Sequence, residues 1–471
     1  MWRTVEIPIW LLTLILILAL LSFLSHFLFP SVRWFLRRRM ERLVAELNKR
    51  LERPIQPFKL MHRNDMIVRL AHDPKVMEAV VATAAETGQP ESVALERARS
   101  YAREIVPSFS ALLYFGIATR VARKVARLLY RVRIERFDAE ALAAIDRKAT
   151  VVFVMNHRSN MDYVLVTYLA ASRSALSYAV GEWARIWPLS GLIRSMGAYF
   201  IRRRSDNGLY RRVLARYVQM ATEEGVTQAI FPEGGLSLDG RLGPPKLGIL
   251  SYIVQGWRPG AREVVFIPVA LNYDRVFEDR VLIAAAEAGR RRFRTNPLSI
   301  LRFVLKHAWR KLTGRFRRFG YAAVSFGAPV TLSDIVAEGV EHATERLALR
   351  LMGEIRAVMP VPPVPLVAAA LGDDATIRRP ELMARMHALA ERLAVTGRHV
   401  AVPPGPVETR VETALDTLER RRLITRDGDL LCVAAEAGPI LRFYAASIGD
   451  ILGNESAGTG PTEATVETAK S

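Results

Sequence analysis

The sequence has almost no cysteine and is short of acidic side chains. Its single cysteine, Cys432, cannot form an internal disulfide, which excludes a small secreted scaffold held together by disulfides. Asp and Glu total 47 against 67 Lys and Arg, so the 471-residue chain carries a formal net charge of +20. A hydrophobic content of 50% excludes a wholly disordered chain. These features predict a folded, basic protein with a negatively charged partner, either nucleic acid, anionic lipid or a phosphorylated ligand.

A long apolar segment near the N-terminus lacks charged side chains. Residues 7–29 contain no ionisable residue except His26, and a helix of this length reaches about 34 Å, enough to cross a hydrocarbon core. Arginines cluster after Pro30, which places the downstream side in the cytoplasm. The alternatives are a long interfacial helix and a cleaved signal peptide, although the apolar part of a signal peptide usually has only about 7–15 residues. We therefore expect a transmembrane anchor at 1–30 and a single-pass protein of the cell membrane with a cytoplasmic catalytic domain.

The middle of the chain predicts an α/β fold. Residues 31–145 are expected to form a basic juxtamembrane and helical region. Short apolar runs rich in β-branched residues then alternate with helical stretches, which is typical of buried strands in a mostly parallel sheet. The predicted strands are 149–155, 229–231 and 263–270, and a helix is expected at 161–171. We assign 146–335 to a twisted sheet flanked by helices, with its motif core at 151–280.

The C-terminal part is predicted to be a separate accessory region. A helix and a proline-rich linker are expected at 336–366, because the run at 359–366 contains few backbone donors. A small, mostly helical domain follows at 367–453. Its expected elements are helices at 378–396 and 407–423 and a hairpin at 423–432 with an Asp-Gly turn. The tail at 454–471 has no periodicity and is predicted to be disordered.

His157 and Asp162 form the pattern that most strongly indicates chemistry. The histidine falls in the predicted turn between strand and helix, and the carboxylate falls in the first helical turn, where it can fold back onto a ring nitrogen. Such a carboxylate fixes the imidazole tautomer while the other nitrogen removes a proton from a hydroxyl. The alternative is a surface histidine followed by an ordinary capping aspartate. A metal hydrolase lacks a third ligand at a recognisable spacing, so no metal is expected.

Two further blocks favour binding of an anionic group. Glu233 directly follows a predicted strand, and Gly234 and Gly235 allow close backbone approach before the loop continues to Arg241 and Lys246. An ordinary strand-to-helix loop is the alternative. Arginines 202–204 follow another apolar run, and guanidinium groups bind phosphate in a bidentate manner. A solvated sheet edge is the alternative for these arginines.

In this order the blocks resemble the glycerol-3-phosphate 1-O-acyltransferase family, within the phospholipid and glycerol acyltransferase superfamily. The resembling segments are 157–163, 197–203, 232–248 and 266–270. The Pro-Pro-Lys sequence at 244–246 and the long helical region before the first motif favour this branch over the shorter lysophosphatidic acid acyltransferases.

The resemblance implies roles for individual residues. His157 would be the general base and Asp162 its orienting partner. Arg202 would bind the acceptor phosphate, and the pocket would be shaped by Glu233, Gly234 and Gly235. The chain departs from the family at Leu236 and Leu238, where arginines are usual, and the cations that would compensate are Arg203, Arg204, Arg241 and Lys246.

The predicted activity is transfer of a fatty acyl group from acyl-CoA or acyl-carrier protein to the sn-1 hydroxyl of glycerol 3-phosphate in phospholipid biosynthesis. The acyl thioester is a co-substrate, and no cofactor is expected. Alternatives are acylation of a lysolipid or amino-alcohol lipid, or an inactive lipid-binding scaffold. Basic and aromatic residues at 290–318 favour a bilayer with anionic lipids over nucleic acid as a partner. The sequence does not indicate an oligomeric state.

Overall fold

The computed structural model describes residues 8–10, 12–13, 16–17, 38–39, 41–170, 174–181, 189–202, 207–289, 309, 313–314, 316–395 and 407–453. The chain divides into two compact units, Met1–Ile55 with Ser172–Ser174 and Gln56–Ala171 with Ala175–Ser471. In the first unit residues 41–50 are helical, and Glu46 forms exposed ion pairs with Lys49 and Arg50. All elements described below belong to the second unit.

The predicted membrane location requires correction. No helix in the part of the chain that the structure describes is long and apolar enough to cross a membrane. The expectation of a single-pass protein of the cell membrane is therefore wrong. Most of the apolar run at 7–29 lies outside the described residues. Most of the basic segment 290–318 and the whole tail 454–471 lie outside them as well.

An eight-stranded sheet forms the centre of the second unit, with the strand order β1-β7-β6-β2-β5-β3-β4 and β8 paired to β6. The strands are β1 (Arg131–Arg136), β2 (Thr150–Met155), β3 (Ser177–Val180), β4 (Tyr199–Phe200), β5 (Gln228–Ile230), β6 (Val264–Tyr273), β7 (Tyr321–Phe326) and β8 (Val330–Thr331). The α/β fold and the strands expected around 150, 229 and 264 are confirmed. Buried Val, Ile and Phe side chains in β2 and β6 explain why these strands read as continuous apolar runs.

Strands β2, β3, β4, β5 and β6 run parallel, and β7 and β8 pair with β6 in the opposite direction. The carboxyl ends of the five parallel strands therefore share one edge of the sheet, the usual place for a site in an open α/β sheet. The outermost strand, β1, begins ahead of residue 146, where the sheet was expected to start. Its charged residues alternate with Val132 and Ile134, a pattern that fits an edge strand.

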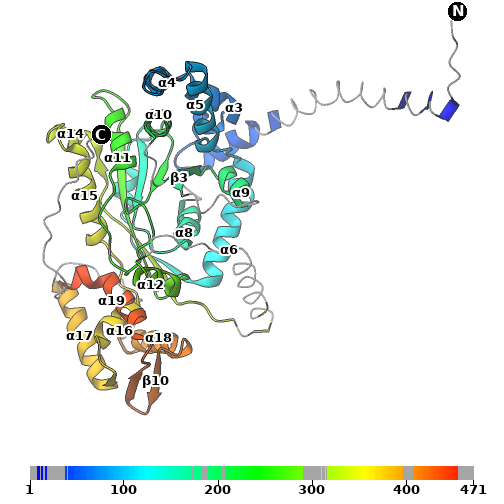
Figure 1. The fold of residues 1–471 in the computed structure, drawn as a ribbon. Helices are drawn as coiled ribbons and strands as arrows, with labels where there is room; N and C mark the ends of the chain where they lie inside the picture. The colour runs from blue at the N-terminus through cyan, green and yellow to red at the C-terminus, as the bar shows by residue number, and fades with distance from the viewer. Residues whose placement is uncertain are drawn as a thin grey trace, which may run out of the picture. The chain divides into compact units, whose positions relative to one another are not determined.

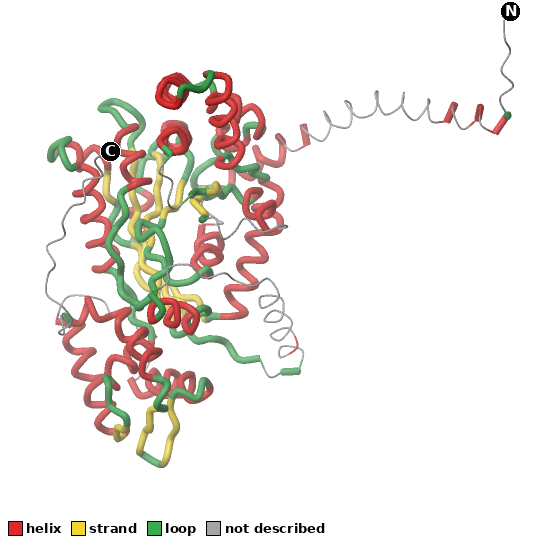
Figure 2. Tube along the Cα trace, in the orientation of Figure 1, coloured by secondary structure: helices red, strands yellow, loops and turns green. Residues whose placement is uncertain are grey.

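Helices cover both faces of the sheet (Figure 2). Ahead of β2 the chain forms α2 (Pro57–Leu60), α3 (Arg63–Ala71), α4 (Pro74–Thr87), α5 (Glu91–Ile105), the π-helix η1 (Leu112–Ala118), α6 (Thr119–Leu129) and α7 (Ala139–Ala143). Between and after the later strands it forms α8 (Met161–Ala170), α9 (Leu189–Ser195), α10 (Gly208–Glu223), α11 (Gly248–Gly256), α12 (Asp279–Glu287), α14 (Leu332–Ala337) and α15 (Ala343–Ala357). Helix α6 packs against α8, α10 packs against α4, α5 and α11, and α15 packs against β6.

The C-terminal helices pack together around one apolar helix (Figure 1). They are α16 (Pro363–Leu371), α17 (Arg379–Val395), α18 (Val407–Arg420) and α19 (Gly438–Leu452), accompanied by an antiparallel sheet of β9 (Thr376–Arg378), β10 (Ile424–Asp427) and β11 (Leu430–Val433). The linker expected at 359–366 is wrong in its second half, because 363–366 form the buried first turn of α16. Proline is tolerated there, since the first helical N–H groups have no intrahelical acceptor.

Candidate active site

The turn after β2 is held at the carboxyl edge of the sheet by Asn156. Its side-chain nitrogen Nδ2 donates to the Leu271 carbonyl at 2.9 Å, and its Oδ1 accepts from the Leu271 amide at 2.7 Å. The side chain thus continues the pairing between β2 and β6 for one more position, while the backbone leaves the strand. This leaves residues 157–160 free to form the tight turn that leads into α8.

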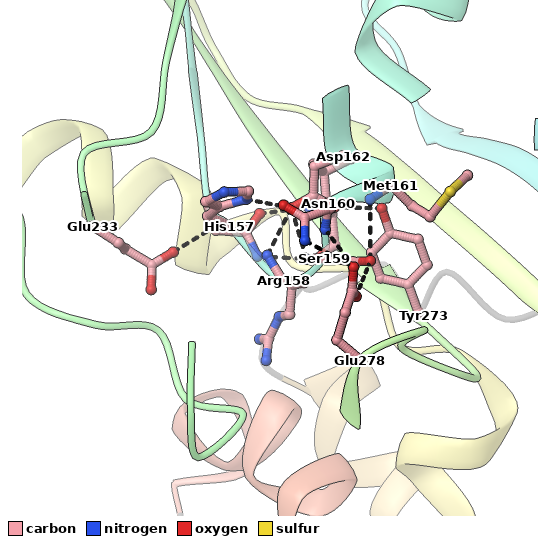
Figure 3. Close-up of polar contacts among 11 residues, drawn as sticks. His157, Arg158, Ser159, Asn160, Met161, Asp162, Glu233, Tyr273 and Glu278 are labelled. Atoms are coloured by element: carbon pink, nitrogen blue, oxygen red, sulfur yellow. Dashed lines mark hydrogen bonds and ion pairs between the residues drawn. The ribbon is translucent and has the colours of Figure 1, made fainter. Parts of the chain in front are cut away.

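His157 and Asp162 lie in contact in this turn (Figure 3). His157 Nδ1 is 2.8 Å from Asp162 Oδ2, and the two residues are only 2% and 0% exposed. The same carboxylate oxygen accepts from the backbone amides of Arg158 and Ser159 at 2.7 and 3.0 Å. Tyr273 at the end of β6 donates its hydroxyl to Oδ1. Four donors therefore satisfy a fully buried carboxylate, whose burial would otherwise be costly.

Aromatic rings fix the plane of the His157 imidazole. Phe231 stacks on it with ring centroids 4.1 Å apart, and Tyr163 meets it edge-on at 5.4 Å. Burial raises the pKa of Tyr273 well above its usual value, and the Asp162 charge adds to this shift. Tyr273 therefore stays protonated and continues to donate to Asp162. Because Asp162 engages Nδ1, Nε2 is the ring nitrogen that can accept a proton.

Glu233 ties the glycine-rich loop to the histidine turn. Its Oε1 accepts from the His157 amide at 2.8 Å, and its Oε2 accepts from the Gly243 amide at 2.9 Å. Burial raises the pKa of Glu233, and the two amide donors oppose this shift. Ser237 adds a second link, because its amide donates to the His157 carbonyl at 2.9 Å. Glu233 therefore shapes the backbone around His157.

The glycine loop also brings Lys246 close to this region. Gly234 has a φ of +65°, and a Cβ there would lie 2.8 Å from Lys246 Cδ. The Lys246 side chain thus crosses directly over Gly234, where the positive φ favours glycine. Lys246 and Arg241 are both exposed, at the two ends of the same loop.

The other predicted phosphate ligands lie in different surroundings. Arg202 follows β4, and its Nε and Nη2 bind the Glu104 carboxylate at 2.9 and 2.7 Å. Its guanidinium also lies over the rings of Tyr101 and Tyr210. Hydrogen bonding to Glu104 raises the pKa of Arg202. Arg203 and Arg204 lie outside the described residues.

Leu236 and Leu238, which replace the arginines usual in the resembled family, are only partly exposed. Both pack against the apolar core of the molecule. Ser237 between them turns inward and is buried. The two leucines therefore hold the loop by apolar packing at the positions where cations were expected.

Three residues of the site were not identified from the sequence. Arg158 is 1% exposed and donates to the carbonyls of Gly240 and Ser447, the latter at 3.2 Å. Tyr273 donates to Asp162, and Glu278 accepts from Ser159 and Asn160. Only Arg158 had a local signal, its place next to His157. The other two are more than a hundred residues from the turn, and only the fold brings them to it.

The arrangement fits general-base catalysis on a hydroxyl group. A buried carboxylate orients an imidazole and can stabilise the imidazolium that forms when Nε2 takes a proton. The cationic residues around the glycine loop favour an anionic substrate.

Comparison with known proteins agrees with this chemistry. Residues 134–272 match the Acyltransferase family, and residues 304–446 match the glycerol-3-phosphate acyltransferase C-terminal region. The glycerol-3-phosphate acyltransferase of Aeromonas hydrophila subsp. hydrophila is 28% identical over 383 residues, 76% of this chain and 46% of that protein. The protein of the same name from Xanthomonas campestris pv. campestris is 25% identical over 437 residues, 86% of this chain and 48% of that protein. The resemblance predicted from the motifs is confirmed.

The chain spans about half the length of these curated relatives. The crystal structure of the 1-acyl-sn-glycerophosphate acyltransferase from Thermotoga maritima aligns with a TM-score of 0.31 and 17% identity, covering 51% of this chain and 79% of that one.

Proposed function

We propose that this chain transfers a fatty acyl group from a thioester to a hydroxyl of glycerol 3-phosphate. Its matches to the Acyltransferase family and to the glycerol-3-phosphate acyltransferase C-terminal region support this activity. The buried contact between His157 and Asp162, at the carboxyl end of β2, is the observation that supports this proposal most directly. The acyl donor is acyl-CoA or acyl-carrier protein, and the acceptor position is the sn-1 hydroxyl.

The reaction needs no nucleophile from the protein. Nε2 of His157 takes the proton of the acceptor hydroxyl as its oxygen attacks the thioester carbonyl, and Asp162 stabilises the resulting imidazolium. The new C–O bond forms, the C–S bond breaks, and the thiolate leaves with the proton returned by the imidazolium. The products are the acylated acceptor and a free thiol. The rings of Phe231 and Tyr163 hold the orientation of the imidazole during the proton transfers.

Lys246 and Arg241 are the proposed ligands of the acceptor phosphate. Both are exposed and belong to the loop that Glu233 ties to His157. Arg202, the phosphate ligand that the resemblance implies, is bound in a bidentate manner by Glu104, so it would have to exchange this ion pair for the acceptor phosphate. A cation that binds phosphate in both ground and transition states lowers the acceptor KM more than it raises kcat.

The acceptor is tested with purified protein, radiolabelled acyl-CoA or acyl-carrier protein, and three acceptors: glycerol 3-phosphate, 1-acyl-glycerol 3-phosphate and glycerol. We expect saturable acylation of glycerol 3-phosphate. Lys246→Ala should raise the acceptor KM about tenfold, equivalent to one charge-assisted hydrogen bond, and leave the donor KM nearly unchanged. Lys75→Ala, an exposed lysine of α4, is the matched control. Saturable acylation of glycerol without acylation of glycerol 3-phosphate would refute the proposal.

A further inference from the structure

The Glu278 carboxylate contacts the turn at 157–160 that carries His157, called the catalytic turn below (Figure 3). Its Oε2 accepts from Ser159 Oγ at 2.7 Å, and its Oε1 accepts from the Asn160 amide and from Asn160 Nδ2 at 3.2 and 3.0 Å. The same turn presents the Arg158 and Ser159 amides to Asp162. Glu278 therefore fixes the backbone that fixes Asp162, without contacting His157 itself.

The next residue, Asp279, faces the C-terminal helices instead. Its Oδ2 accepts from Arg421 Nη2 at 2.5 Å and from the Tyr444 hydroxyl at 2.6 Å. The side chains of Asp279 and Arg421 are only 6% and 7% exposed. The Tyr444 oxygen in turn accepts from Arg421 Nη1 at 3.1 Å and from the Val276 amide at 3.0 Å. The segment from Val276 to Asp279 is thus anchored to α19 and to the residue after α18.

We propose that Glu278 is a positioning residue for acyl transfer, and that Arg421 and Tyr444 of the C-terminal region act on the catalytic turn through it. The inference rests on the proposed acyltransferase function. Its physical basis is that Glu278 is the N-cap residue of α12 and Asp279 its first residue, so a shift of the buried Asp279 contacts moves Glu278 with it. A displacement of about 1 Å at a catalytic base can cost about 100-fold in rate.

A second contact joins the same two regions and supports the inference. Arg158, in the catalytic turn, donates to the carbonyl of Ser447 in α19 at 3.2 Å and to the carbonyl of Gly240. Helix α19 therefore reaches the turn on one side through Arg158 and on the other through Tyr444, Asp279 and Glu278. The Acyltransferase match ends at residue 272, so Glu278, Arg421 and Tyr444 all lie outside it.

Steady-state kinetics test the role of Glu278. In Glu278→Ala we expect kcat to fall about 10- to 100-fold while the KM of donor and acceptor changes less than about threefold. Glu278→Gln keeps an oxygen for Asn160 and gains an amide that can donate to Ser159 Oγ, so it should restore most of kcat. Glu287→Ala, at the exposed far end of α12, is the matched control and should behave as wild type.

A double-mutant cycle tests the connection to the C-terminal region. Tyr444→Phe removes the hydroxyl that donates to Asp279 and should lower kcat about 3- to 10-fold, the loss of one hydrogen bond to a charged group. The inference predicts that Tyr444→Phe costs little more in the Glu278→Ala background, because both act on the same turn. Fully additive effects would overturn the proposed connection.

Hydrogen exchange of the unliganded protein separates this inference from the proposed function. Peptides covering residues 156–162 should exchange faster in Glu278→Ala and Tyr444→Phe than in wild type or Glu287→Ala. Unchanged exchange in Glu278→Ala, or faster exchange with wild-type kcat, would overturn the inference. If wild type acylates no glycerol 3-phosphate, the proposed function fails, and the exchange result still decides whether Glu278 holds the turn.

Discussion

Asp162 is the buried carboxylate at the centre of the site. It is fully buried, and four donors converge on its two oxygens, from His157, from two backbone amides and from Tyr273. A side chain that donates here would leave donors of its neighbours unpaired, because every neighbour already donates. The carboxylate therefore has two tasks, to orient the imidazole and to hold the turn itself.

Asp162→Asn should abolish most of the activity while the protein still folds. The new amide nitrogen cannot accept a hydrogen bond, so the imidazole rotates or adopts the other tautomer. We expect kcat to fall about 100-fold or more. Circular dichroism should show the wild-type spectrum. A folded variant that keeps a tenth of the wild-type kcat would contradict this assignment.

Asp274 gives the molecule a pH-dependent stability unrelated to catalysis. It is fully buried, and burial raises its pKa to about 7, although the amides of Val364 and Tyr321 donate to it at 2.8 and 2.7 Å. Between its unfolded pKa of about 4 and its folded pKa of about 7, the folded state holds the extra proton. The contribution of Asp274 to stability is therefore full below about pH 4 and is lost as pH rises through about 7.

This titration predicts a measurable difference between wild type and Asp274→Asn. The free energy of unfolding of wild type minus that of the variant should decrease as pH rises from about 4 to about 7, because the asparagine side chain of the variant does not titrate. Chemical denaturation at several pH values measures the free energies of unfolding of wild type and Asp274→Asn. Asp373→Asn, at a side chain that is 82% exposed, is the control. A difference that stays constant with pH would show that Asp274 does not titrate in this range.

At the scale of elements, the glycine loop depends on close contact with α19. Gly240 has a φ of +87°, and a Cβ at this position would collide with the Phe443 carbonyl oxygen, which belongs to the backbone of α19. The Gly240 carbonyl meanwhile accepts from buried Arg158. Glycine is required here for two reasons, the left-handed backbone and the lack of space.

Gly240→Ala should therefore destabilise the protein by about 1–3 kcal/mol, from backbone strain and displacement of the loop. Gly260→Ala is the matched control, because Gly260 also has positive φ, +83°, but has no atom within 4 Å of a built Cβ. Thermal unfolding compares the two variants. Gly260→Ala reports the cost of placing alanine at positive φ, and the additional loss in Gly240→Ala reports the collision with α19. Equal melting temperatures would contradict the close contact of this loop with α19.

The elements differ in how well the sequence predicts them, for physical reasons. Strand β6 is fully buried and β2 is buried except at Phe153, so the apolar runs are easily recognised. Strand β1 carries four charged residues in six, which hides an edge strand. The prolines of α16 predict a linker, and only the burial of this helix against α18 and α19 shows otherwise. The composition of such a segment does not predict whether it is helical, because its packing against neighbouring helices stabilises the helix.

At the scale of the whole molecule, the turn at 157–160 lies between parts of the chain that are distant in sequence. The contact between His157 and Asp162 could be predicted because both residues lie in one local turn. Glu278 and Tyr273 could not be, because their contacts exist only after β6 pairs with β2. The contacts of Arg158 with the Gly240 loop and with α19 likewise need the C-terminal helices in place. The site is therefore a property of the sheet and the C-terminal region together.

The proposed acyl transfer depends on His157 acting as the base that accepts the proton of glycerol 3-phosphate. The most direct measurement is the rate of acceptor-dependent thiol release from acyl-CoA and acyl-carrier protein by wild type, His157→Ala and His387→Ala, the last an exposed histidine of α17. We predict that His157→Ala loses at least about 100-fold in kcat and remains folded, while His387→Ala matches wild type. A folded His157→Ala protein with near-normal turnover would contradict the mechanism.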